Sequence, residues 1–361
     1  MPDRADRQTA QERLFDWYAK HHRTLPWRDR PTPYGVLVSE LMLQQTRVDT
    51  VLGYYERWMA RWPTLADLAA ADLQDVLAQW TGLGYYNRAR NLHKTAQLVV
   101  RDHGGQLPSD AASLAQLPGL GPYTLGAVRS IAFGEPAALV DGNVSRVFSR
   151  WHAQPGQPQP RWLWQTAQDW LALPTAQRDP GTWNQALMEL GATVCTPRKP
   201  ACAACPVQPH CLVFAQDLQE AIPPARVRAA PKQVTAAYAI VAREGRILLG
   251  RRPAKGRWAG LWEPPGLEGA AAGVQLGRWL LSQGLQVDRA LPALVHVLTH
   301  RRYEVESLVV LVPPGHEPDL QPLGYVEQRW QVADDAQSQT SGLSRLGQRL
   351  CEQAGEAGEI A

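Results

Sequence analysis

The sequence predicts a multidomain protein with an all-α first part, a linker and a smaller α/β second part. Apolar residues recur at helical spacing through residues 1–220. Residues 221–233 are rich in Pro, Ala and Arg, a composition typical of linkers. Residues 234–361 change to the alternating pattern of strands, and a chain of 361 residues is long enough for two or three domains.

Particular stretches predict the elements of each part. Helices are expected at residues 10–22, 33–59, 71–80 and 85–104, with Gly and Pro between them. In the second part, residues 234–243 and 246–252 flank a Glu-Gly turn and predict a β-hairpin. Residues 294–312 predict further strands, and residues 341–355 predict a closing helix.

Charge and hydropathy restrict the class of protein. The amino terminus is charged and lacks the apolar core of a secretion signal, and no apolar run approaches the roughly 20 residues of a membrane span. We therefore expect a soluble, cytoplasmic protein with no membrane partner. The net charge of +3 neither requires nor excludes nucleic acid, so any DNA-binding site must be a local feature.

Four of the five cysteines lie close together in the sequence. Cys195, Cys202, Cys205 and Cys211 have the spacing C-x6-C-x2-C-x5-C, and a reducing compartment disfavours disulfides. Thiolates at this density bind zinc or an iron–sulfur cluster. Only Cys202 and Cys205 form the close pair usual in zinc sites, so the spacing favours a [4Fe-4S] cluster, with zinc as the alternative. Cys351 is expected to be an ordinary thiol.

The stretch LPGLGPYTLGAV contains a glycine turn. Gly119 and Gly121 flank Leu120, and Pro122 stands where a helix would begin. A tight turn of this kind exposes backbone N–H groups at a helix amino terminus, which can hold a DNA phosphate without side-chain charge. A plain corner between two helices is the alternative.

Two carboxylates are candidates for chemistry. Glu40 lies on a helical stretch with Val36, Leu37 and Leu43, and burial among them would raise its pKa and keep it protonated, as a general acid requires. Asp141 precedes a helical pattern, so it is expected to cap the helix and to stay charged there. One protonated and one ionised carboxyl can cleave a glycosidic bond. The alternatives are an exposed helical Glu and a simple cap.

Several longer stretches together resemble the endonuclease III superfamily of DNA base-excision glycosylases, and within it the adenine DNA glycosylases. They follow the family's order: LPWR, SELMLQQTRV, GLGYYNRARNL, LPGLGPYT, VDGNVSRV and WNQALMELGATVCTPRKPACAACP. The resemblance implies an all-α, two-lobed helix-hairpin-helix glycosylase domain with a [4Fe-4S] cluster loop. Residues 30–133 would form the helix-hairpin-helix lobe, and the amino-terminal helices with residues 134–220 would form the cluster lobe.

The resemblance implies excision of adenine paired with 8-oxoguanine or guanine in double-stranded DNA, which leaves an abasic site. The adenine would be flipped out of the duplex. Glu40 would protonate it, Asp141 would stabilise an oxocarbenium-like sugar, and Asn143 would orient this network. Tyr123 stands where bifunctional relatives carry a nucleophilic Lys, and the chain has no Lys between Lys94 and Lys199, so a monofunctional enzyme is expected.

The resemblance also assigns contacts with the substrate. The adenine pocket would be lined by Trp27, Arg28, Glu189 and Tyr123. The damaged strand would contact Gln45, Thr46, Leu83 and Tyr85, with the Tyr85 ring as a wedge in the duplex. The alternative roles of these residues are core packing, a surface ion pair and solvated helix faces.

The last part of the chain resembles a Nudix fold, most clearly in GRWAGLWEPPG. A Nudix hydrolase needs a helix with a carboxylate cluster that binds Mg²⁺. The segment LEGAAAGVQLGRWLLSQG has a single Glu, so this domain is expected to recognise DNA rather than to hydrolyse a nucleotide. The family's Phe-Ser-His stretch, which senses 8-oxoguanine, is matched here by Leu298, Thr299 and His300.

Two other functions stay open at this point. One is a glycosylase of the same superfamily with a different base specificity. The other is a noncatalytic iron–sulfur protein that binds DNA. The chain is expected to act as a monomer, associated with the nucleoid.

Overall fold

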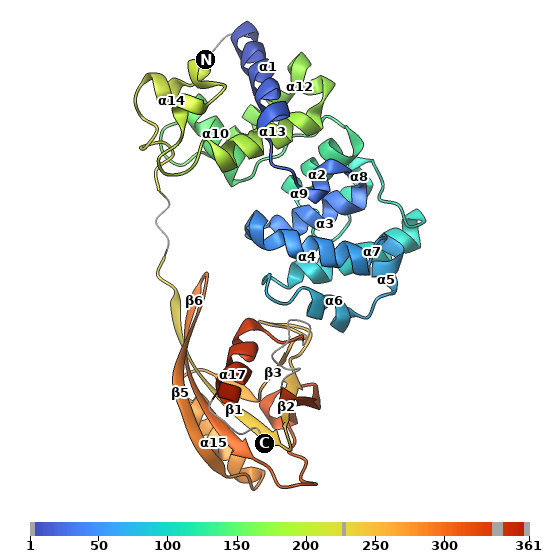
Figure 1. Cartoon of the computed structure of the whole chain (residues 1–361), viewed down its shortest axis with the longest axis vertical. Coiled ribbons are helices and arrows are strands. Elements are labelled where there is room, and N and C mark those ends of the chain that lie inside the picture. The colour runs from blue at the N-terminus through green and yellow to red at the C-terminus, as the bar shows by residue number, and fades with distance from the viewer. Residues whose placement is uncertain (1–3, 226–228, 334–341, 357–361) are drawn as a thin grey trace. The chain divides into compact units, whose positions relative to one another are not determined.

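The computed structural model describes residues 4–225, 229–333 and 342–356. Figure 1 shows the whole chain, coloured by residue number. The chain divides into unit 1, residues 1–70 and 91–227, and unit 2, residues 71–90 and 228–361. Residues 71–90, which the sequence pattern placed in the first domain, therefore group with the carboxy-terminal part. The middle of the predicted linker, residues 226–228, lies outside the described residues.

Unit 1 is helical, as predicted. Its first helix, α1, packs with α10, α11, α12 and α13 around one apolar core that includes Leu14, Phe148 and Trp183. The helices are α1 (Arg4–His21), α2 (Pro26–Asp29), α3 (Pro33–Leu43), α4 (Val48–Arg61), α5 (Leu65–Ala70), α7 (Asn87–His103), α8 (Ala111–Ala115), α9 (Pro122–Ala127), η1 (Val128–Ala132), α10 (Gly142–Trp151), α11 (Pro160–Leu171), α12 (Pro174–Arg178), α13 (Pro180–Thr193), η2 (Cys202–Ala204), η3 (Gln208–His210) and α14 (Leu212–Ala215).

Capping side chains and prolines set the boundaries of helices α3 and α9. Thr32 accepts a hydrogen bond from the Gly35 amide at the start of α3, and α9 begins at Pro122 directly after Gly121. The continuous helix expected over residues 33–59 is instead two helices, because the chain turns between Leu43 and Val48 and Gln45 has a positive φ of 59°.

The described residues of unit 2 form a seven-stranded mixed sheet in the order β3-β2-β1-β6-β5, with β4 paired to β1 and β7 paired to β2. The hairpin predicted at the Glu-Gly turn is present as β1 and β2, and β1 and β6 pair in parallel. The elements are α6 (Leu73–Gln79), β1 (Lys232–Arg243), β2 (Arg246–Arg251), β3 (Trp262–Glu263), β4 (Gly266–Glu268), α15 (Ala272–Ser282), β5 (Val287–Leu298), β6 (Arg301–Leu311), η4 (Gln321–Leu323), β7 (Glu327–Val332) and α17 (Arg345–Glu356).

Helices cover both faces of this sheet. Alternate residues of β1 point to opposite sides, so Tyr238 and Ile240 pack with α17 while Ala239 and Val241 pack with α15. Helix α15 has the sequence AGVQLGRWLLS and carries no carboxylate. No helix in the described ranges is long and apolar enough to cross a membrane.

Candidate active site and iron–sulfur loop

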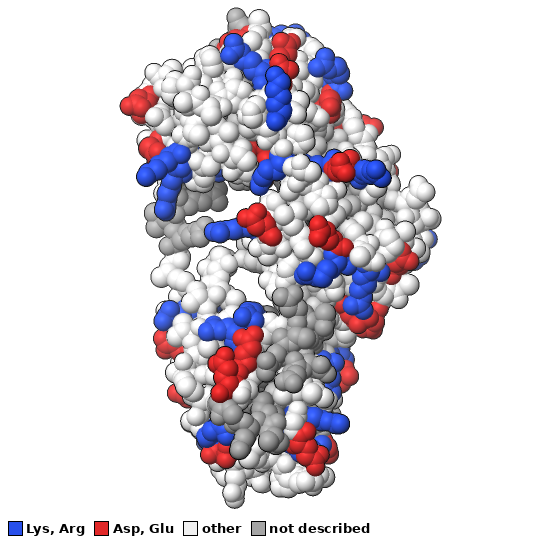
Figure 2. Space-filling model, viewed as in Figure 1, with Lys and Arg blue, Asp and Glu red and all other residues white. Residues whose placement is uncertain are grey.

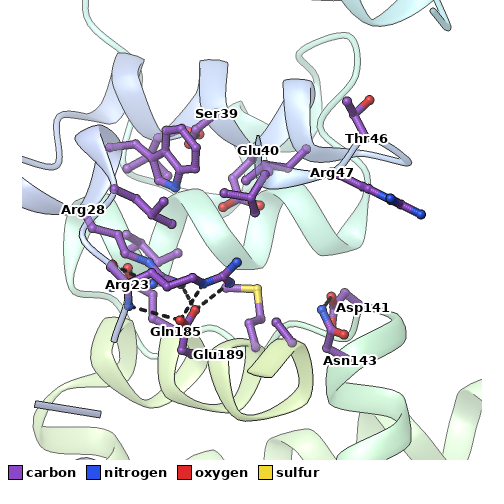
Figure 3. A pocket seen from close by; sticks show the side chains of 18 of the residues that line it. Arg23, Arg28, Ser39, Glu40, Thr46, Arg47, Asp141, Asn143, Gln185 and Glu189 are labelled. Carbon is purple, nitrogen blue, oxygen red and sulfur yellow. Dashed lines mark hydrogen bonds and ion pairs between the residues drawn. The ribbon is translucent and has the colours of Figure 1, made fainter. Parts of the chain in front are cut away.

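A cavity of about 390 Å³ lies in unit 1, within the size range of small-molecule sites. It brings together eight of the residues that the sequence singled out, from six separate segments of the chain. These are Trp27, Arg28, Glu40, Thr46, Tyr123, Asp141, Asn143 and Glu189. In Figure 3, Glu40 on α3 and Glu189 on α13 lie on opposite sides of the cavity, with Asp141 and Asn143 at a third side.

Glu40 is a buried carboxyl with one hydrogen-bond donor. Glu40 is 4% exposed, and the Tyr123 hydroxyl donates a hydrogen bond to Glu40 Oε2 at 2.5 Å. Burial raises the pKa of Glu40 to about 7, because it penalises the charged form more than the Tyr123 hydrogen bond favours it. Val36 and Leu43, two of the apolar neighbours from which the sequence predicted a protonated acid, line the same cavity.

Asp141 is the N-cap of α10, as the sequence pattern predicted. Its Oδ1 accepts a hydrogen bond from the Val144 amide at 2.7 Å, and its Oδ2 accepts one from Asn143 Nδ2 at 3.0 Å. Burial nevertheless raises the pKa of Asp141, against the backbone amides of Val144 and Asn143, which lower it. The expectation of a simply stabilised anion omitted this burial, which the sequence pattern around Asp141 does not reveal.

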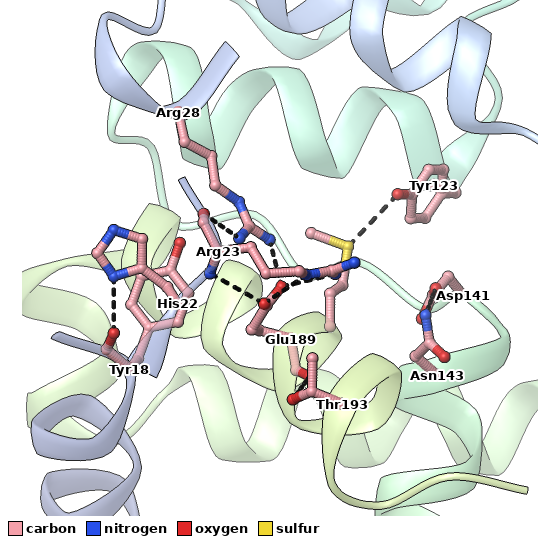
Figure 4. Close-up of polar contacts among 10 residues, drawn as sticks. Tyr18, His22, Arg23, Arg28, Tyr123, Asp141, Asn143, Glu189 and Thr193 are labelled. Atoms are coloured by element: carbon pink, nitrogen blue, oxygen red, sulfur yellow. Dashed lines mark hydrogen bonds and ion pairs between the residues drawn. The ribbon is translucent and has the colours of Figure 1, made fainter. Parts of the chain in front are cut away.

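Glu189 is held by two arginines. Arg23 donates from Nε at 2.7 Å and from Nη2 at 2.9 Å, and Arg28 donates from Nη2 at 2.9 Å (Figure 4). Burial alone would raise the pKa of Glu189, but the hydrogen bond from Arg23 and the charges of Arg28 and Arg23 outweigh it and lower that pKa. Arg23 is 166 residues away from Glu189 in the sequence, so no local pattern predicts this contact.

A second arginine network joins Asp141 to the cysteine loop. Arg146 donates from Nη2 to Asn143 Oδ1 at 2.9 Å and from Nε to the Cys195 carbonyl at 2.7 Å. It also donates from Nη2 to the Gly191 carbonyl at 2.6 Å. A Cβ placed on Gly191 would lie 2.5 Å from Asn143 Cβ, so only glycine allows this close approach of α13 to α10.

The four clustered cysteines line a single small cavity together with Arg150, Trp151 and Phe214. Among the residues that the structure describes, no three His, Cys, Asp or Glu side chains converge closely enough to hold a single metal ion. Four thiols spread around one cavity fit a cubane cluster, which is larger than one ion, better than they fit tetrahedral zinc.

The remaining predicted residues lie away from the cavity. Gln45 is exposed just after α3, and Gly119 has a φ of +86° in the turn before α9. In unit 2, Tyr85 is 44% exposed, and a hydrogen bond of 2.7 Å joins its hydroxyl to Thr299 Oγ1. His300, the next residue after Thr299, is exposed. Two residues assigned to DNA contact have less accessible side chains: Leu83 is only 5% exposed, and Leu298 packs partly against the core under α17.

Three parts of the chain match known protein families. Residues 38–172 match the HhH-GPD superfamily of base excision DNA repair proteins, residues 195–211 match the iron-sulfur binding domain of endonuclease III, and residues 236–353 match the NUDIX domain. The chain is similar in fold to a solved thermostable thymine-DNA glycosylase, with a TM-score of 0.51 and 27% identity over 59% of this chain and 98% of that one.

Relatives extend over most of the chain. The adenine DNA glycosylase of Homo sapiens is 38% identical and covers 84% of this chain and 68% of its own length. The adenine DNA glycosylase of Rattus norvegicus is also 38% identical, over 85% of this chain and 72% of that protein. That of Arabidopsis thaliana is 36% identical, over 84% of this chain and 58% of that protein.

The fold, the buried carboxylates and the cysteine loop define an iron–sulfur base-excision DNA glycosylase with an added Nudix-like domain. Within that class, the chain belongs to the adenine DNA glycosylase family. The [4Fe-4S] prediction is confirmed over zinc, with Cys195, Cys202, Cys205 and Cys211 as the residues that would hold the cluster.

Proposed function

We propose that this enzyme hydrolyses the N-glycosidic bond of adenine that is paired with 8-oxoguanine or guanine in duplex DNA. The observation that carries the proposal is Glu40, a buried carboxyl with a pKa of about 7, in one cavity with Asp141 and the Arg-bound Glu189. A base inside a duplex cannot reach such a cavity, so the adenine must first leave the stack.

The two sides of the cavity would then have different tasks. The Glu189 carboxylate, fixed by Arg23 and Arg28, can accept a hydrogen bond from the amino group of adenine, and the guanidinium groups can donate to its ring nitrogens. Glu40 would transfer its proton to N7 of the base, which makes adenine a better leaving group.

Departure of the base leaves positive charge on the sugar. Asp141, with Asn143 at its Oδ2, would stabilise this oxocarbenium-like ion. Glu40, now a carboxylate, would accept a proton from the incoming water, whose hydroxyl bonds to the sugar and completes the abasic site. The cavity lining contains Tyr123 and no Lys, so no Schiff base is expected and the enzyme would be monofunctional.

Contact with DNA would depend on local features. On the face shown in Figure 2, basic and acidic side chains are interspersed without a large area of one sign. The backbone at Gly119 and Gly121 would hold a phosphate, and Gln45, Thr46 and Tyr85 would contact the opened duplex. Thr299 and His300 would recognise the base opposite adenine. We also propose that the protein acts on DNA as a monomer in the cytoplasmic nucleoid.

The test is single-turnover excision on a panel of duplexes that contain A:8-oxoG, A:G, T:G or an oxidised pyrimidine. The proposal expects release of adenine from the first two only, with A:8-oxoG preferred. Asp141→Asn should bind the A:8-oxoG duplex at fixed salt and release no base, since Asn can still cap α10 but cannot stabilise a cation. Excision of thymine or of an oxidised pyrimidine in preference to adenine would overturn the assignment.

A further inference from the structure

Arg150, on the buried face of α10, is an arginine that the proposed chemistry does not use. The residue is 3% exposed, and its guanidinium is surrounded by acceptors. It donates to the Thr196 carbonyl at 2.8 Å, to the Pro197 carbonyl at 3.3 Å and to Cys195 Sγ at 3.3 Å. These three contacts lie within the first turn of the iron–sulfur loop.

The fourth contact of Arg150 is with a different segment. Its Nε donates to the carbonyl of Ile222 at 2.8 Å, where the chain leaves unit 1. Ile222 is itself only 8% exposed, and its amide donates to the Leu218 carbonyl at 3.1 Å. One planar guanidinium thus spans the cysteine loop and the start of the connection to unit 2, which a flexible ammonium could not do with the same number of bonds.

Two further hydrogen bonds tie the same segments to unit 1. The Lys199 amide, in the cysteine loop, donates to Glu220 Oε1 at 3.1 Å. Gln157 Nε2 donates to the Pro224 carbonyl at 2.5 Å. Residues 220–224 are therefore fixed at three points, and two of these points are shared with the loop that carries Cys195 and Cys202.

We propose that Arg150 is a positioning residue that couples the iron–sulfur loop to the connection between the two units. With a cluster bound to the cysteines, residues 195–199 would be held in place. The hydrogen bonds of Arg150 and Glu220 to this loop would then hold residues 220–224 in place as well, so that the connection to unit 2 begins from a fixed point. A fixed tether keeps the effective concentration of a linked domain high. We expect this coupling to affect the preference for 8-oxoguanine over guanine opposite adenine. That expectation rests on the proposed function, in which Thr299 and His300 recognise the opposite base.

The first variant is Arg150→Lys, which keeps the positive charge and removes the planar guanidinium that bonds to both segments. Three quantities are measured on the full chain: iron content, amide hydrogen exchange of residues 218–222, and single-turnover excision from A:8-oxoG and A:G duplexes. Iron should be retained, exchange at residues 218–222 should rise about tenfold as local opening becomes easier, and the preference for A:8-oxoG should fall about threefold. The excision rate on A:G should change little. Arg161→Lys, an exposed position on α11, is the matched control.

Wild-type exchange at residues 218–222 in iron-loaded Arg150→Lys would overturn the proposal. If that variant fails to load iron, Glu220→Gln decides, because Glu220 accepts a hydrogen bond from the Lys199 amide and none of the described hydrogen bonds joins it to a cysteine sulfur. It should raise exchange about threefold with full iron, and unchanged exchange would again overturn the proposal. Failure of the proposed function would give a different result. The wild-type protein would then release no adenine, while amide hydrogen exchange at residues 218–222 would still report the coupling.

Discussion

Two buried glutamates line the same cavity and have opposite electrostatic behaviour. The side chain of Glu189 is 0% exposed, yet its pKa is lowered; Glu40 is 4% exposed, and its pKa is raised to about 7. The difference is the partner. Glu189 has two guanidinium groups within 3 Å, whereas the only hydrogen bond that Glu40 receives in the described contacts comes from the neutral Tyr123 hydroxyl.

Burial alone therefore does not determine the protonation state of a carboxyl. Desolvation raises the pKa of both groups, and an adjacent cation then decides whether the anion survives. One side of the cavity is suited to recognising an amino group, and the other is suited to giving up a proton. Changes that exchange or remove these partners should therefore have different and separable effects.

The largest effect is expected from removing the proton donor. Glu40→Gln keeps the shape of the side chain and should lower single-turnover adenine excision about 10³-fold with binding intact. Glu189→Gln leaves Glu40, the proton donor, in place and removes only a charged hydrogen-bond acceptor, so it should lower the excision rate about tenfold. Parallel rate and binding measurements on an A:8-oxoG duplex compare the two, and equal losses would remove the distinction between the two sides.

The raised pKa of Glu40 also has a consequence for stability. The folded-state pKa of about 7 exceeds the unfolded value of 4.5, so the contribution of Glu40 is present below pH 4.5 and is lost as the pH rises to about 7. Glu40→Gln does not ionise. Its free energy of unfolding, relative to wild type, should therefore increase by about 3 kcal/mol between pH 4.5 and pH 8. Denaturant unfolding at both pH values checks this, and a constant difference would show that Glu40 ionises normally.

Gly191 links the side of Glu189 to Asp141, because it follows Glu189 on α13 and lies against Asn143. Gly191→Ala would push Asn143 and Asp141 away and should lower excision about 10²-fold. Alanine by itself favours a helix by about 1 kcal/mol, so poorer helix propensity would not explain a loss. Gly53→Ala on α4, where an added Cβ meets only the mobile end of Arg57, is the control and should excise normally.

The smallest effect is expected from removing one of the two arginines that bind Glu189. Arg28→Gln leaves Glu189 with Arg23 alone, which should raise the pKa of Glu189 and lower excision about threefold. Arg23 still donates to both oxygens of Glu189, so the carboxylate should remain in place. Arg30→Gln, an exposed neighbour, should excise normally. A loss as large as that of Glu40→Gln would show that the cavity depends on Arg28 for more than the position of Glu189.

The sequence predicted those features that depend on neighbours along the chain. The apolar neighbours of Glu40, the cap at Asp141, the hairpin at the Glu-Gly turn and the cysteine spacing are all local patterns. Features that depend on tertiary contact could not be read in this way. Arg23 meets Glu189, Gly191 meets Asn143, and Arg150 meets Ile222 only after the chain has folded.

The pH dependence of adenine excision shows whether Glu40 is the acid. Single-turnover rates on an A:8-oxoG duplex should fall about tenfold per pH unit above about pH 7 in the wild type, as Glu40 loses its proton. The residual rate of Glu40→Gln should lack this decline. A wild-type rate that stays level from pH 6 to pH 9, or the same decline in Glu40→Gln, would show that Glu40 is not the acid.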